Sequence, residues 1–117
     1  MADRYEDFKN RLPMSYVDFL EQNHGWVGEL SERLGYAVVW RRTEIQENWD
    51  GYQMAEFMSN PDRWFPFGSN GGGEMLTFDL TVGDAVFWIP FIGMSDEEAL
   101  AQDYRFEDLA TEIRAHM

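Results

Sequence analysis

A run of three glycines, Gly71-Gly72-Gly73, lies between two aromatic segments and constrains the fold of this chain more than any other feature. Trp64–Phe67 precedes the run and Glu74–Leu80 follows it, and both are rich in residues that favour β-strands. Glycine has no Cβ and adopts positive φ freely, so the run lets the chain reverse sharply. The pattern predicts two antiparallel strands joined by a glycine turn, with at least one of these glycines at positive φ.

A phosphate-binding loop is the alternative interpretation of the same segment. Gly68 and Gly73 have the spacing of the G-x-x-x-x-G-K-[ST] loop, in which the lysine reaches the phosphates. Here Glu74-Met75 stands in place of the Lys-Ser/Thr pair, and a carboxylate at that position would repel a phosphate. We therefore expect a connection between strands.

The other hydrophobic patterns place helices at both ends of the chain and strands in the middle. Apolar residues at helical spacing predict helices over 13–24 and 106–115, and continuous apolar runs predict strands over 36–40 and 85–89, with a weaker candidate at 26–30. Capping-box patterns that begin at Thr43 and Ser95 predict two further helix starts. Trp40 and Trp88 lie in strand patterns, and we expect both to be buried. The order predicts a single α+β domain over residues 1–117, with a central, largely antiparallel sheet flanked by N- and C-terminal helices.

The chain is strongly acidic for its size. Its 117 residues carry 22 acidic and 9 basic side chains, for a formal net charge of −13. This charge repels nucleic acid and anionic membranes and favours a basic protein partner. The alternative is that the acid only keeps an aromatic-rich protein soluble. No apolar stretch has the length of a signal peptide core or a membrane span, so we expect a cytoplasmic protein.

The residues that usually carry catalysis are scarce. Cysteine is absent, which excludes disulfides and thiol chemistry, and the two histidines are His24 at a helix end and His116 beside the C-terminus. No G-x-S-x-G elbow accompanies them. The abundant carboxylates keep a small metal-dependent hydrolase as an alternative. The expectation is a protein without catalytic activity, cofactor or metal.

Four residues are candidates for partner binding. Trp49 precedes Asp50-Gly51 in a polar, acidic stretch, where an aromatic side chain at a turn can anchor a partner. The alternative is that Trp49 folds back over the sheet edge. Asn70 and Glu74 bracket the glycine run. Trp49 and Asp50 are the leading candidates for contact with the partner, and Asn70 and Glu74 come next.

The chain resembles the SUKH superfamily, which includes the fungal Smi/Knr regulators of cell-wall synthesis and many bacterial immunity proteins. The resemblance rests on Leu12-Pro13-x-x-Tyr16-x-x-Phe19-Leu20 with Asn23-x-Gly25, on 67–74 followed by Phe78-Asp79, and on the strand and helix that follow. It implies a non-enzymatic protein-binding domain. The typical bacterial role is to bind and neutralise a cognate toxin, often a basic nuclease.

The resemblance leaves some points open. The alternative role that it implies is a regulatory or scaffolding adaptor of the Smi/Knr type. The family has no universal set of toxin-contacting residues, so none is assigned here by resemblance. We expect a monomer or a weak homodimer. Phe91-Ile92-Gly93-Met94 is more apolar than the family pattern at that position and suggests an apolar contact surface.

Overall fold

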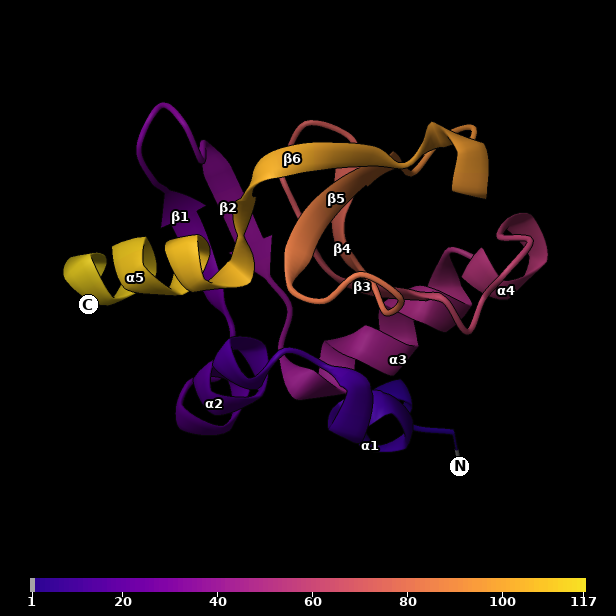
Figure 1. Ribbon diagram of the computed structural model, residues 1–117, viewed down its shortest axis with the longest axis horizontal. Coiled ribbons are helices and arrows are strands. Elements are labelled where there is room, and N and C mark those ends of the chain that lie inside the picture. The colour runs from indigo at the N-terminus through magenta and orange to yellow at the C-terminus, as the bar shows by residue number, and fades with distance from the viewer. Residues whose placement is uncertain (1) are drawn as a thin grey trace.

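The computed structural model describes residues 2–117 and shows a six-stranded antiparallel sheet flanked by helices (Figure 1). The strands are β1 (Trp26–Glu29), β2 (Tyr36–Val39), β3 (Trp64–Ser69), β4 (Glu74–Asp79), β5 (Ala85–Pro90) and β6 (Leu100–Arg105), and each pairs with the next in chain order. The helices are α1 (Arg4–Phe8), α2 (Met14–Gln22), α3 (Arg42–Gly51), α4 (Met54–Phe57) and α5 (Phe106–His116), with 3₁₀ turns η1 (Lys9–Arg11) and η2 (Asp96–Glu98). The predicted α+β fold is confirmed.

The glycine run connects β3 to β4, as its sequence predicts. Gly71 and Gly73 have φ of +75° and +98°. The Asn70 side-chain oxygen accepts hydrogen bonds from the backbone N–H of Gly72 (2.8 Å) and of Glu74 (3.3 Å), and the Asn70 N–H donates to the Glu74 carbonyl at 3.0 Å. Asn70 therefore closes the turn from within, because an asparagine side chain can take the place of a backbone acceptor.

An aromatic core fills the space between the sheet and the helices α2 and α5. Tyr16 of α2 lies within 5.1 to 5.4 Å, centroid to centroid, of Phe67, Phe78 and Phe106, and the rings of Phe67 and Phe78 stack at 4.3 Å. These distances are typical of favourable ring pairs. The predicted helices over 13–24 and 106–115 thus cover this face of the sheet, and their apolar stripes point into the same cluster.

The sheet is curled, so that its first hairpin reaches β6 and α5 (Figure 1). In the β1–β2 connection, Ser31 donates through its N–H and its hydroxyl to the Glu112 carboxylate, both at 2.9 Å. Arg33 beside it donates to the Asp103 carbonyl of β6 at 2.6 Å. The curl brings the two ends of the sheet together on this side, and the connection between β5 and β6 projects on the other.

Several local expectations are corrected by the structure. β6 was not predicted, because Tyr104 is its only buried residue and the strand has no apolar alternation. Ser95 opens only the 3₁₀ turn η2, and α3 begins at Arg42, one residue before Thr43. Trp40 is buried as expected. Trp88 is only half-buried, and its indole N–H donates to the Tyr104 hydroxyl at 3.1 Å.

Candidate protein-binding surface

Trp49, the first of the predicted binding residues, lies inside the protein. Only 6% of it is exposed, and the Arg4 guanidinium covers its ring at 3.5 Å from the centroid. Arg4 also donates to the carbonyl oxygen of Trp64 at 2.7 Å, and burial lowers the pKa of Arg4 to about 10. Trp49 therefore folds back against the sheet, which is the alternative interpretation of its sequence position. It offers a partner almost no surface.

The other predicted binding residues lie in two separate places. Asp50 is exposed, and its carboxylate accepts a hydrogen bond from the Gln46 side chain at 3.0 Å. Asn70 and Glu74 are half-buried and bonded to each other at 2.8 Å in the glycine turn. Arg4 links Trp49 to the first residue of β3, whereas Asn70 follows the last residue of that strand. A six-residue strand is about 20 Å long, so the Arg4–Trp49 contact and the glycine turn lie at opposite ends of β3.

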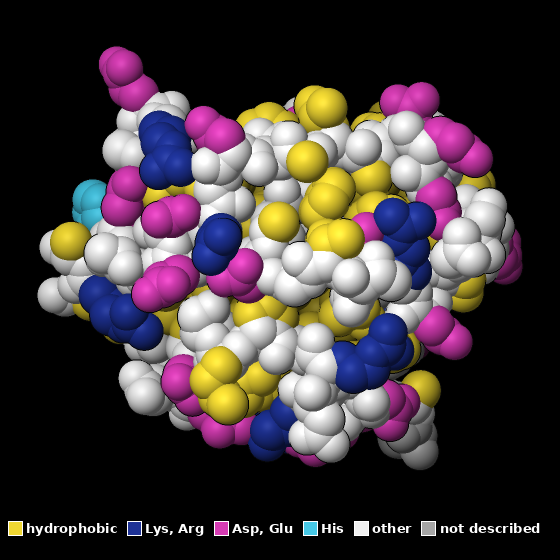
Figure 2. All heavy atoms as spheres, viewed as in Figure 1, with side chains coloured by type: hydrophobic (Ala, Val, Ile, Leu, Met, Phe, Trp, Pro, Cys, Tyr) yellow, Lys and Arg dark blue, Asp and Glu magenta, His cyan; other side chains and the backbone are white. Residues whose placement is uncertain are grey.

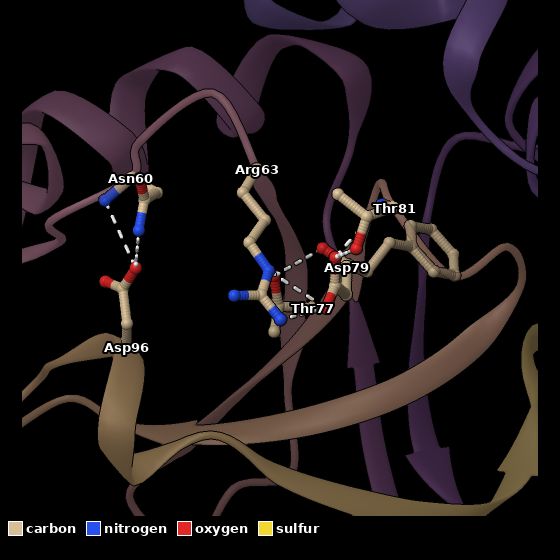
Figure 3. A network of polar contacts seen from close by, with 7 residues as sticks. Asn60, Arg63, Thr77, Asp79, Thr81 and Asp96 are labelled. Carbon is tan, nitrogen blue, oxygen red and sulfur yellow. Dashed lines mark hydrogen bonds and ion pairs between the residues drawn. The ribbon is translucent and has the colours of Figure 1, made fainter.

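The densest polar network lies where β3 begins and β4 ends (Figure 3). The Asp79 carboxylate is 1% exposed and uses both of its oxygens. One accepts from the Arg63 Nε and Nη2 at 3.0 and 2.7 Å, and the other accepts from the Thr81 N–H and hydroxyl at 3.0 and 2.6 Å. Burial acts to raise the pKa of Asp79, but these donors outweigh it and the net pKa is lowered. The network fastens the chain that enters β3 to the end of β4.

The network has the chemistry of a structural cluster. A carboxylate with four donors and almost no exposure has no free lone pair to offer a substrate. Among residues 2–117, no group of three or more His, Asp or Glu side chains is arranged to hold a metal ion. No helix in the same described range is long and apolar enough to cross a membrane.

Replacing Asp79 with asparagine should lower the free energy of unfolding by about 2 kcal/mol at neutral pH, because charge-assisted hydrogen bonds are lost and Arg63 faces an amide. The folded-state pKa of Asp79 is lowered. Its stabilisation is therefore present above the unfolded pKa and is lost as the pH falls through the folded pKa. Urea unfolding at pH 7 and pH 3 should show the difference between parent and variant shrinking in acid. The exposed Asp62→Asn is the control, and an equal loss in both variants would contradict the prediction.

Most of the net charge is concentrated in the middle of the chain. Between residues 43 and 104 there are twelve acidic side chains and a single basic one, Arg63, which accounts for −11 of the formal −13. Arg63 is bound to Asp79. Arg33 and Arg105, from outside this range, pair with Asp103 and Asp84, and most of the other acids in the range have no basic partner.

Within this acidic region, α4 and the β5–β6 connection form a corner with exposed apolar side chains. The rings of Tyr52 and Phe91 pack at 4.5 Å between centroids. The next residue, Ile92, is 94% exposed, and Phe57 of α4 is 54% exposed. We call these four residues the apolar corner. In Figure 2, acidic side chains lie at the upper right, over η2 in Figure 1, and others are spread across the left of the face.

Asp96 holds the two segments of the corner together. Its carboxylate accepts from the backbone N–H of Ser59 at 2.8 Å. It also accepts from the backbone N–H of Asn60 at 3.1 Å and from the Asn60 side chain at 3.0 Å (Figure 3). Three hydrogen bonds thus fix the β5–β6 connection against the chain that follows α4, and the Tyr52–Phe91 contact fixes it against the chain that precedes α4. Sequence patterns flagged Phe91–Met94 as apolar but missed Tyr52, because its position beside Phe91 is a tertiary contact between distant segments.

Most of the chain matches the model of a protein family. No curated protein matches the chain significantly. A model of the SMI1 / KNR4 family (SUKH-1) matches residues 5–110, which include the aromatic core, the glycine turn and all six strands. The chain therefore belongs to the SMI1 / KNR4 family (SUKH-1).

Proposed function

We propose that the chain is a non-enzymatic binding protein that acts as an immunity protein and neutralises a cognate basic toxin, of the nuclease type. Membership of SUKH-1 is consistent with a binding or immunity role. The observation that carries the proposal is the charge, with −11 of the −13 in residues 43–104. Nucleases bind a polyanion and tend to be basic, so electrostatic attraction steers an acidic protein to them. The acidic protein then competes with the nucleic acid for the basic surface of the nuclease.

The proposal also covers the localisation and the oligomeric state of the protein. A toxin of this type is neutralised where it acts, so we place the chain in the cytoplasm. We propose a monomer or a weak homodimer, because a net charge of −13 on 117 residues opposes close self-association.

Co-expression with the toxin domain encoded by a neighbouring gene tests the proposed function. The chain should restore growth of cells that express the active toxin and should co-purify with the inactivated toxin. An unrelated acidic protein of similar size and net charge is the matched control, because it separates specific neutralisation from bulk electrostatic binding. Growth arrest that persists at a high level of the chain would contradict the proposal.

A screen for thermal stabilisation separates the binding protein from a metal-dependent hydrolase. Mg²⁺, Mn²⁺ and Zn²⁺ should leave the melting temperature unchanged. A ligand that binds only the folded state stabilises it in proportion to RT ln(1 + [L]/Kd), so a catalytic metal site would give a concentration-dependent rise. Such a rise, together with turnover that a carboxylate-to-amide change abolishes, would favour the hydrolase.

A further inference from the structure

We propose that the apolar corner, Tyr52, Phe57, Phe91 and Ile92, is the docking face for a basic protein that presents an apolar side chain surrounded by Lys and Arg. Glu56 precedes Phe57 in α4, Glu97 and Glu98 lie in η2 of the β5–β6 connection that carries Ile92, and all three are exposed. The inference deepens the proposed function and rests on it, because it assigns the surface through which the toxin is held.

The apolar corner brings together exposed side chains from two segments of the chain. Single exposed hydrophobic residues are normal on a protein surface, whereas contiguous apolar patches mark interaction sites. Ile92 is 94% exposed and therefore gains almost nothing from folding, while Tyr52 and Phe57 are 46% and 54% exposed. Tyr52 packs on Phe91, which Ile92 follows in the chain, and the Asp96 bonds to Ser59 and Asn60 hold the same connection against the segment that follows Phe57.

The acidic side chains near the corner indicate a basic occupant. Glu56, Glu97 and Glu98 form no salt bridge within residues 2–117. An apolar centre with a charged rim is the arrangement in which central residues supply affinity and rim charges supply orientation and association rate. A second copy of this chain would set these acids against their own equivalents, and like charges in contact are unfavourable. A basic protein satisfies both the centre and the rim.

The corner is held in shape before it binds. Asp96 bonds to Ser59 and Asn60 from the β5–β6 side. Because the two segments are already tied, docking does not have to order a flexible loop, and the entropic cost of association is reduced. The surface is therefore suited to tight binding of a rigid partner.

The test uses the purified chain and the catalytically inactivated toxin domain from the neighbouring gene, with both rate constants measured by biolayer interferometry. Ile92→Lys puts a cation at the centre of the corner, and we expect affinity to fall by about 100-fold, on the scale of a disrupted hot spot. Val82→Lys is the matched control. Val82 is also exposed, lies in the β4–β5 turn at the other end of β4, and brings the same change in charge, so it should cost only a few-fold.

A second pair of variants tests the rim. Glu97→Gln with Glu98→Gln should slow association by roughly 3- to 10-fold at low salt and leave dissociation nearly unchanged. Glu29→Gln with Glu32→Gln removes the same charge from the exposed β1 hairpin and should have a smaller effect. Thermal unfolding of each variant shows that the fold is retained.

The outcomes separate the two proposals. If the parent binds and Ile92→Lys binds within twofold of it, the docking face is elsewhere and the immunity function stands. If Ile92→Lys and Val82→Lys lose affinity equally, the effect is one of bulk charge, and the corner is again excluded. If the parent itself fails to bind the toxin domain, the proposed function fails and the docking face fails with it.

Discussion

Replacing Tyr16 with alanine should lower the free energy of unfolding by about 3–5 kcal/mol, the range for removing a large aromatic side chain from a core. Tyr16 is fully buried, and its ring contacts those of Phe65, Phe67, Phe78 and Phe106. Truncation would remove the centre of this cluster. The cavity would be lined by rigid rings that cannot close over it.

Tyr16→Phe should have the opposite outcome and leave stability unchanged or raise it. The Tyr16 hydroxyl has no hydrogen-bond partner among residues 2–117, and burial raises the pKa of Tyr16 well above its usual value. Removing a buried polar atom that has no partner removes a desolvation cost. Urea unfolding of parent, Tyr16→Ala and Tyr16→Phe compares the ring with its hydroxyl. A loss of more than about 1 kcal/mol in Tyr16→Phe would show that the hydroxyl is hydrogen-bonded in solution.

Gly68→Ala should be the most damaging small substitution, with a cost of about 3 kcal/mol or more. A Cβ at Gly68 would overlap the carbonyl oxygen of Val38 on β2, which is backbone and cannot rotate away. β2 pairs with β3 through Val38↔Ser69 and Val39↔Gly68, and the Trp40 N–H donates to the Phe67 carbonyl at 2.9 Å. A methyl group there would push the two halves of the sheet apart.

Gly72→Ala is the matched control for that effect. A Cβ at Gly72 would have its nearest neighbour, the Asn70 Oδ1, at 3.5 Å, and Gly72 is not among the glycines with positive φ. The change should cost less than about 1 kcal/mol. Equal urea midpoints for the two variants would mean that β2 can shift to accommodate the methyl group.

The sequence predicted those parts of the fold whose residues carry a strong periodic pattern. Buried strands such as β5 and the amphipathic α5 were found, because burial imposes their composition directly. β6 was missed because this edge strand buries a single residue, Tyr104, and the rest of its sequence lacks the pattern of a buried strand. Trp88 is only half-buried because its partner across the sheet is Leu100 of β6, the strand at the edge.

The candidate surface could be predicted only in part. The acidic residues Asp96–Glu98 and the apolar segment after β5 are visible in the sequence, and both belong to the proposed docking face. Trp49 looked like an anchor because its neighbours are polar. Its burial depends on Arg4, forty-five positions earlier, whose guanidinium covers the ring. The contact of Tyr52 with Phe91 and the bonds of Asp96 likewise join segments far apart in the chain, and no local pattern encodes them.

The association rate of the chain with the basic toxin domain that we propose as its partner, measured as ionic strength rises from about 10 to 150 mM, tests the central claim most directly. Over that range the Debye length falls from about 30 to about 8 Å. If the acidic surface steers association, the association rate should fall by about tenfold or more as ionic strength rises, while the dissociation rate changes little. An association rate indifferent to salt, or no binding at micromolar concentration, would contradict the account of this chain as an acidic protein that captures a basic toxin.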